Sequence, residues 1–120
     1  MARNIIDLPT LGDDGKLYRD TAVDMVESLI PNPWESCHAP DLLELENGDL
    51  LCCWFAGSRE GNADISIAVA RLPADAEQWE QPVIVSDDPT RSEQNPSLFQ
   101  NPNGDIWLMY TAQAAKKPDD

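Results

Sequence analysis

One short pattern occurs twice in this chain, and a repeat of its length limits the folds that are possible. The first copy runs from residues 39–42 (Ala-Pro-Asp-Leu) to 47–49 (Asn-Gly-Asp). The second runs from 95–98 (Asn-Pro-Ser-Leu) to 103–105 (Asn-Gly-Asp), at a constant offset of 56 residues. Short strands repeated every 40 to 50 residues or so are typical of β-propeller blades. We therefore predict an all-β chain made of propeller blades, each with one long loop.

The repeat also predicts how the chain is organised. A propeller needs about 4–8 blades to close its ring, whereas a 56-residue unit fits only about twice into 120 residues. We expect residues 1–35 to form an N-terminal arm and a possible ring-closing strand. Residues 36–120 are expected to form the first blade and the start of the second, as a truncated part of a larger propeller.

Apolar alternation and turn residues divide the two blades into six expected strands. These cover residues 41–45, 49–55, 64–70 and 83–85 in the first blade, with Trp79 beside the last, and 97–100 and 105–111 in the second. Each Asn-Gly pair is expected to supply the positive φ angles of a tight hairpin turn. Residues 21–30 fit either a helix, from the spacing of Val23, Val26 and Ile30, or a strand that pairs with the last blade, and the two prolines that follow favour the strand.

The charge excludes some partners. The chain has 8 Lys and Arg against 22 Asp and Glu, a net charge of −14. Nucleic acid and anionic membranes would be repelled, although an anionic ligand stays possible where arginines cluster. The first residues do not resemble a secretory signal, which predicts a cytoplasmic protein, or a secreted one if a leader is missing.

The cysteines predict no disulfide framework, since there are only three. Cys52 and Cys53 are neighbours in a strand, so their side chains should point to opposite faces as small core residues. Cys37 and His38 have no second ligand pair at zinc-like spacing. No cofactor or metal is predicted, although a divalent cation at the propeller centre stays open.

Three segments are placed where a propeller builds its site. The inner strand of each blade lines the central channel, and the loops at one rim carry function. The segments that enter or leave inner strands at that rim are 37–40, 55–61 and 91–96.

Residues 36–111 resemble the sialidase (neuraminidase, Asp-box repeat) superfamily. The matching motifs are Cys37-His38-Ala39-Pro40, Asn47-Gly48-Asp49, Ser58-Arg59-Glu60, Asp64-Ile65 and Asn95-Pro96. There are two departures: the superfamily's Phe-Arg-Ile-Pro arginine falls on His38, and only Trp79 survives of the Asp-box. The residues at 36–39, 54–57 and 91–96 look more similar to one branch of the superfamily than to the sialidases themselves. That branch contains sialidase-like propellers that are rhamnosyl-glucuronate lyases and rhamnosidases.

The resemblance implies a propeller of six or seven blades and a carbohydrate-active enzyme. Its partner would be the non-reducing end of an acidic oligosaccharide or polysaccharide, cleaved next to a uronic acid by a lyase or a glycosidase. Two alternatives stay open: a non-catalytic propeller that binds sugar or protein, and an exo-sialidase. The remaining blades would complete the site.

His38 and Arg59 are the expected catalytic residues. His38 is the chain's single histidine, and an imidazole can both accept and donate a proton near neutral pH, which suits proton transfer. Arg59 has a planar fork that can hold a substrate carboxylate, although a surface ion pair with Glu60 is the alternative. The expected substrate-binding residues are Glu60, Asp64, Arg91, Glu93, Gln94 and Asn95. Asp64 and Asn95 also have structural alternatives, as a carboxylate that bonds loop amides and as a cap of the blade entrance. Trp54 and Trp107 are expected in the core.

Overall fold

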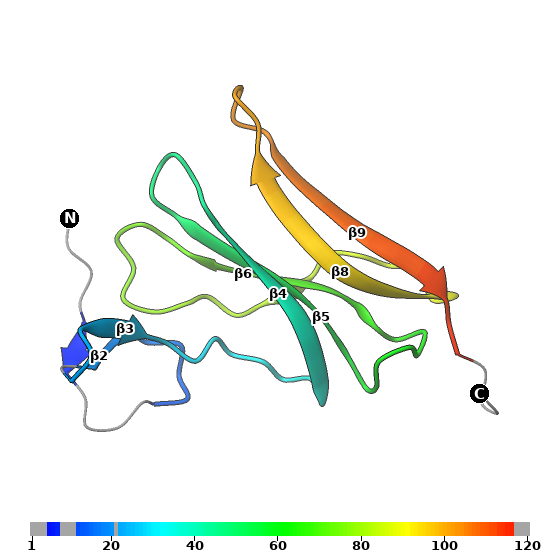
Figure 1. Ribbon diagram of the computed structural model, residues 1–120, viewed down its shortest axis with the longest axis horizontal. Coiled ribbons are helices and arrows are strands. Elements are labelled where there is room, and N and C mark those ends of the chain that lie inside the picture. Colours follow the sequence, from blue (N-terminus) through cyan, green and yellow to red (C-terminus); the bar gives the residue numbers. More distant parts are fainter. Residues whose placement is uncertain (1–4, 8–11, 21, 117–120) are drawn as a thin grey trace.

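The computed structural model describes residues 5–7, 12–20 and 22–116, and this part of the chain contains only strands, turns and loops. Its strands are β1 (Ile6–Asp7), β2 (Tyr18–Asp20), β3 (Met25–Glu27), β4 (Ser36–Glu44), β5 (Leu50–Gly57), β6 (Ser66–Leu72), β7 (Val83–Ile84), β8 (Arg91–Gln100) and β9 (Ile106–Ala114). They form three sheets, ordered β1-β2-β3, β4-β5-β6-β7 and β8-β9 (Figure 1). The predicted all-β class is confirmed. No helix in the described residues could span a membrane.

The four-stranded sheet lies where the first blade was predicted, and we call it the first blade and the β8–β9 hairpin the second blade. In the first blade each strand pairs antiparallel with the next along the chain. Its strand order matches the prediction, but several bounds differ. β4 begins at Ser36 rather than 41, because residues 37 and 38 already pair with the end of β5. β6 begins at Ser66 rather than 64, and the outer strand is only Val83–Ile84. Trp79 lies before that strand, where its backbone N–H donates to the carbonyl oxygen of Gly15 at 2.9 Å.

A β-bulge interrupts the first strand of each blade at the same place in the repeat. The pairing register shifts between His38 and Asp41 in β4, and between Gln94 and Ser97 in β8. The residue inside each bulge has a positive φ, 54° at Ala39 and 53° at Asn95. A proline follows each of them, and proline has no N–H to give to the ladder. The 56-residue repeat is therefore a repeat of backbone geometry as well as of sequence.

The two hairpin turns are also alike, but they are not the turns predicted. Gly48 N–H donates to Leu45 O at 2.9 Å, and Leu45 N–H donates to Asp49 O at 2.8 Å. This is a three-residue loop in which only the glycine has a positive φ, 90° at Gly48. Asn47 instead accepts a hydrogen bond from Asp49 N–H at 2.9 Å. The expectation that both turn residues would adopt positive φ is therefore wrong.

β5 is buried on both faces, as its continuous apolar sequence predicts. Cys53 and Phe55 belong to one core cluster, which also contains Leu98 of β8. Cys52 and Trp54 belong to a second cluster on the opposite face. Burial raises the pKa of both cysteine thiols to about 11, so both stay protonated at neutral pH. The prediction that the two cysteines point to opposite faces is confirmed.

The second blade packs against the first through its inner strand. Asp41 Oδ2 accepts a hydrogen bond from Leu98 N–H at 2.8 Å, and Glu93 N–H donates to Ile65 O at 3.0 Å. Figure 1 shows β8 next to the first blade and β9 on its outer side. Trp107 in β9 is exposed, so its expected place in the core is wrong, whereas Trp54 is buried as expected.

The N-terminal segment forms a small sheet rather than a simple arm. β1 pairs parallel with β2, and β2 pairs antiparallel with β3. This sheet lies on the side of the first blade opposite β8 and β9 (Figure 1). Leu17 joins the core cluster around Trp54 and Trp79. β3 lies within residues 21–30, and its pairing with β2 leaves the expected pairing of this segment with a last blade a prediction.

Asp49 is expected to stabilise the fold in a pH-dependent way. Its carboxylate accepts hydrogen bonds from Arg71 Nε at 2.7 Å and Ala74 N–H at 2.8 Å. The Arg71 guanidinium, followed by the Ala74 N–H, holds the pKa of Asp49 below its ordinary 3.8. A lowered pKa stabilises the fold above the pKa of the unfolded chain, and this stabilisation disappears as pH falls through the folded value. Asp49→Asn should lower the melting temperature by several degrees at pH 6, and the difference should shrink below pH 4.

Asp105 provides the matched control for this measurement. It occupies the position of Asp49 in the second repeat, but its side chain is exposed. Asp105→Asn should leave the melting temperature nearly unchanged at both pH values. Equal effects of the two substitutions would contradict the role given to the Arg71 contact.

The bulge residues give a second test of stability. A left-handed conformation costs a residue with a Cβ roughly 1–2 kcal/mol of steric strain. Glycine has no such strain, but it loses more conformational entropy when the chain folds. Ala39→Gly should therefore raise the free energy of unfolding by about 1 kcal/mol in chemical denaturation. Asn95→Gly should gain less, since asparagine tolerates this region better. A loss of stability in Ala39→Gly would show that the bulge is not strained.

Candidate functional site

The three segments predicted to carry function lie at one end of the two blades. We call this end the rim; it comprises residues 36–40, 55–65, 91–96 and 111–116. β4 begins there and pairs with the end of β5, with Cys37 opposite Ala56. Two backbone hydrogen bonds join the blades at the rim, Glu93 N–H to Ile65 O at 3.0 Å and Lys116 N–H to Gly61 O at 2.8 Å. Figure 1 shows these strand ends gathered on one side of the molecule.

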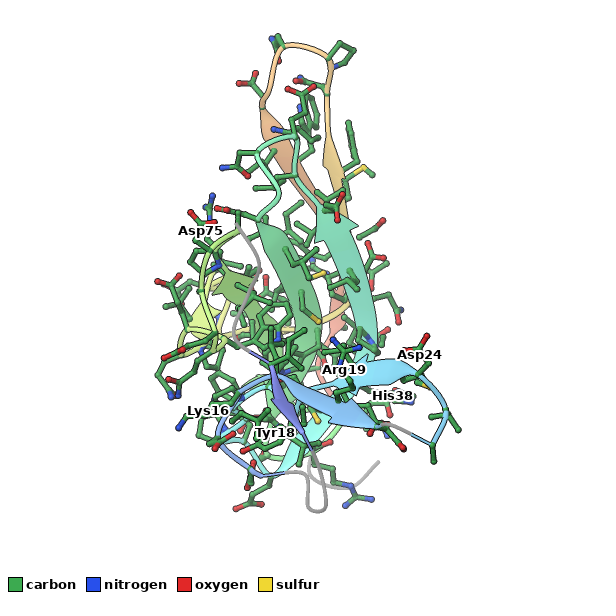
Figure 2. All side chains as sticks on the ribbon, turned by 90° about the vertical axis from the view of Figure 1, so that its left-hand side faces the viewer. Lys16, Tyr18, Arg19, Asp24, His38 and Asp75 are labelled. Carbon is green, nitrogen blue, oxygen red and sulfur yellow. The ribbon has the colours of Figure 1, made fainter. Side chains whose placement is uncertain are left out.

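His38 is exposed and lies opposite Phe55 across the β4–β5 ladder. The two rings meet edge to face, with centroids 5.7 Å apart and planes at 84°. His38 also lines a cavity of about 580 Å³ together with Cys37, Trp54 and residues that precede β4. Figure 2 labels His38 in a view from the side of the N-terminal sheet. The bulge that follows His38 separates this end of β4 from the regular ladder.

Arg59 and Glu60 lie in the loop between β5 and β6, and both side chains are exposed. They form no ion pair with each other, and Arg59 has no ion-pair partner within the part of the chain that the structure describes. The ion-pair alternative for these two residues is therefore not what the structure shows. The guanidinium of Arg59 is open to solvent.

The loop that carries Arg59 is tightly built. Asp64 Oδ2 accepts a hydrogen bond from Ser58 N–H at 3.2 Å, which is the structural alternative considered for this carboxylate. A Cβ at Gly57 would lie 2.8 Å from the Asp64 carbonyl oxygen. Gly61 has φ +94°, and a Cβ there would lie 2.6 Å from Cε of Lys116. Both glycines are therefore needed for this loop to close against β6 and against the segment after β9.

The third segment divides into exposed and buried side chains. Arg91 and Asn95 are exposed; Arg91 donates to Ala112 O at 3.1 Å and lies 3.8 Å from Asp88 Oδ2. Glu93 and Gln94 are buried. Glu93 Oε1 accepts from Asp88 N–H at 3.3 Å, and Gln94 Nε2 donates to Ser92 Oγ at 2.9 Å. In the structure the Glu93 side chain thus holds the backbone just before the rim, and the Gln94 side chain holds the Ser92 hydroxyl.

Two residues at or next to the rim, Tyr110 and Lys116, were not singled out from the sequence. Burial, followed by the charge of Glu93 and a hydrogen bond to it, raises the pKa of Tyr110. Tyr110 occupies the position of Trp54 in the repeat, and this was its only sequence signal. Lys116 lies in a segment that reads as a polar tail, so nothing in the sequence indicates its contact with Gly61. It brings a second cationic side chain next to the Arg59 loop.

The structure does not bring all the predicted residues into one cavity. His38 lines the cavity described above, whereas Asp64 and Ser58 line another of about 370 Å³ with Trp34 and Glu35. Trp34 and Trp54 contact each other edge to face at 6.4 Å. Among residues 5–7, 12–20 and 22–116, no group of three or more His, Cys, Asp and Glu side chains could hold a metal ion.

Comparisons with known proteins support the repeat interpretation. The family model described as BNR repeat-like domain matches residues 48–119, which is more than half of the chain. Searches of the curated proteins and of the solved structures returned no match. The matched region starts at the first hairpin turn and includes the rim segments that follow it. With the bulge and the turn each repeated at the same offset, the chain belongs to the BNR repeat-like domain family, whose repeats are of the sialidase type.

Proposed function

We propose that this chain is part of a carbohydrate-active enzyme that acts on the non-reducing end of an acidic glycan. It would cleave a bond next to a uronic acid, as the resemblance to the rhamnosyl-glucuronate branch implies. The observation that carries the proposal is the chemistry of the rim. An exposed imidazole, His38, and an exposed guanidinium without an ion-pair partner in the described residues, Arg59, lie at the same end of the propeller-like sheets.

The rim is less acidic than the chain as a whole, which favours an anionic ligand there over other parts of the surface. The chain is strongly acidic, whereas at the rim the three cations Arg59, Arg91 and Lys116 are matched in number by the carboxylates Glu60, Asp64 and Glu93. Two nearby carboxylates already have partners: Asp64 accepts from Ser58 N–H, and Asp88 accepts from Thr90. The exposed guanidinium of Arg59, without an ion-pair partner in the described residues, suits bidentate contact with a substrate carboxylate.

In the elimination form of the reaction, His38 would act as the base. It would take the proton on the carbon next to the uronate carboxylate while Arg59 balances the charge that builds up on that carboxylate. The electron pair of the broken C–H bond forms the double bond, and the glycosidic oxygen leaves with a proton from a general acid. Glu60, Arg91 and Asn95 would contact the sugar, with Asp64, Glu93 and Gln94 behind them. The remaining blades would supply the general acid.

Two alternative functions are open: a non-catalytic binding module, and an enzyme with a different substrate. A non-catalytic propeller could use the same polar rim and the nearby tryptophans to bind a sugar. An exo-sialidase would have to bind its substrate carboxylate with His38 at the position where the superfamily has an arginine. Turnover of a rhamnosyl-glucuronide would distinguish the proposed enzyme from the non-catalytic propeller, since a binding module leaves the sugar unchanged. Turnover of a sialoside separates the second.

Replacing His38 should reduce turnover much more than binding. A proton-transfer group contributes typically about 10²–10⁴-fold to the rate, so His38→Ala should lower kcat by a factor in that range. The measurement is made on a preparation that turns over a rhamnosyl-glucuronide. Glu44→Ala is the control, because Glu44 is exposed at the opposite end of the same strand. A parental rate in His38→Ala would remove the catalytic role and favour the binding module.

Replacing Arg59 by lysine should impair both rate and binding. A lysine keeps the charge but cannot form the two parallel hydrogen bonds of a guanidinium to a carboxylate. Arg59→Lys should therefore raise KM and lower kcat, and Arg59→Ala should do so more strongly. The matched control is the binding of an analogue whose uronate is reduced to the neutral sugar, which cannot undergo the elimination. If the arginine holds the carboxylate, parent and variants should bind the neutral analogue about equally; the same loss of affinity for the neutral analogue and for the uronate substrate would contradict this role.

A further inference from the structure

A polar hollow beside the rim is not used by the chemistry described so far. The β4–β5 ladder ends where Ser36 pairs with Gly57, and a cavity of about 370 Å³ lies next to this last pair. Its volume is at the low end of the roughly 300–1,000 Å³ that is typical of small-molecule sites. We call this cavity the Trp34 hollow; it is lined by Pro33, Trp34, Glu35, Gly57, Ser58 and Asp64. Its walls are the segment that enters β4 and the loop that leaves β5.

The aromatic wall of the hollow is supported from behind. Trp34 is half-buried and packs against the core cluster that contains Trp54. The two rings meet edge to face, with centroids 6.4 Å apart and planes at 66°, and Trp54 is itself 6% exposed. The indole of Trp34 is therefore held in place while part of it stays accessible. An indole offers a flat apolar surface on which the C–H face of a sugar ring can stack.

The polar groups of the hollow suit hydroxyl groups. Asp64 Oδ2 accepts a hydrogen bond from Ser58 N–H at 3.2 Å, which orients this carboxylate. Ser58 Oγ accepts from Asn62 Nδ2 at 3.2 Å, so the hydroxyl proton of Ser58 is available to a ligand. Glu35 is exposed and has no ion-pair partner in the described part of the chain. Sugar hydroxyls can donate to such carboxylates in charge-assisted hydrogen bonds.

The charges of the hollow disfavour an acidic sugar. Glu35 and Asp64 are carboxylates, and none of the six lining residues is cationic. A uronate in the hollow would lie against two like charges, and such contacts exclude the wrong partner. Arg59 directly follows Ser58 in the chain, so their Cα atoms are only about 3.8 Å apart. A cation that suits a uronate thus comes directly after a wall that suits an uncharged sugar.

We propose that the Trp34 hollow binds the neutral sugar unit that neighbours the uronate in the glycan. This unit would stack on Trp34 and donate hydroxyl protons to Glu35 and Asp64, while Arg59 holds the uronate carboxylate. Asp64, which lies behind the residues that contact the uronate, would thereby form a wall of a second subsite. The inference rests on the proposed function for the identity of the glycan, but every residue that lines the hollow belongs to the described chain. Binding alone can therefore test it.

The first test titrates the isotope-labelled chain with methyl α-rhamnoside and follows binding by nuclear magnetic resonance. The indole N–H signal of Trp34 and the amide signal of Ser58 should shift together, and glucuronate at the same concentration should shift them much less. Trp34→Ala should weaken binding of the rhamnoside roughly tenfold, as expected for loss of an aromatic anchor. Trp107→Ala is the control, because it also removes an indole but lies on β9, where Trp107 is 51% exposed.

The second test removes one charge from the hollow. Glu35→Gln keeps the size of an exposed side chain, so the fold should be unchanged. It should weaken binding of the rhamnoside several-fold, because a charge-assisted hydrogen bond is lost. It should also strengthen binding of glucuronate, because one like charge is removed. Glu44→Gln removes the same charge at the opposite end of β4 and should change neither affinity.

The outcomes separate this inference from the proposed function. A rhamnoside that leaves the Trp34 signal unchanged overturns the inference, and so does glucuronate that binds the hollow as tightly as the rhamnoside. Glucosamine is the third ligand, because its ammonium group would meet the two carboxylates; if it binds more tightly than the rhamnoside, the hollow is a cation site and the inference fails. A preparation that does not turn over a rhamnosyl-glucuronide contradicts the proposed function but leaves a measured rhamnoside affinity in place.

Discussion

The burial of β5 on both faces is the constraint on which the rest of the structure depends. A strand with apolar side chains on both sides needs a layer against each of them. The second blade provides one layer through Leu98, and the N-terminal segment provides the other through Leu17, which packs there with Trp79 of the first blade. The first blade is thereby held between two neighbours, and its rim becomes the place where three parts of the chain meet. The positions of His38 and Arg59 both follow from this arrangement.

The elements that could be predicted are those with a local and repeated signal. The 56-residue offset and the alternating strands gave the all-β class, the strand order of the first blade and the two-sided burial of residues 50–55. The two turns were predicted at the right residues but with the wrong turn type. Asn-Gly also suits a three-residue loop in which only the glycine needs a positive φ. The start of β4 was missed because the bulge at Ala39 hides the continuity of the strand.

The candidate site could be predicted only in part, since it depends on contacts between distant segments. The sequence indicated which segments would reach the rim, and the loop and strand ends do gather there. It could not show that Glu93 and Gln94 turn inwards, because the order of residues 91–95 gives no clear alternation across a bulge. It also gave no reason to connect Lys116 with Gly61, or Tyr110 with Glu93. Trp107 was expected in the core because its neighbours are apolar, yet burial depends on what covers a strand and not on the strand alone.

The contact between Lys116 and Gly61 has a consequence for the Arg59 loop. One end of this loop is fixed by Asp64 and the first blade, and its tip is fixed by a backbone hydrogen bond to the segment that leaves β9. The backbone that carries Arg59 is therefore held by contacts with both repeats. A small rotation of one blade against the other would move this loop, and the Arg59 side chain with it, although neither sheet would need to deform. The position of Arg59 at the rim therefore depends on the angle between neighbouring blades.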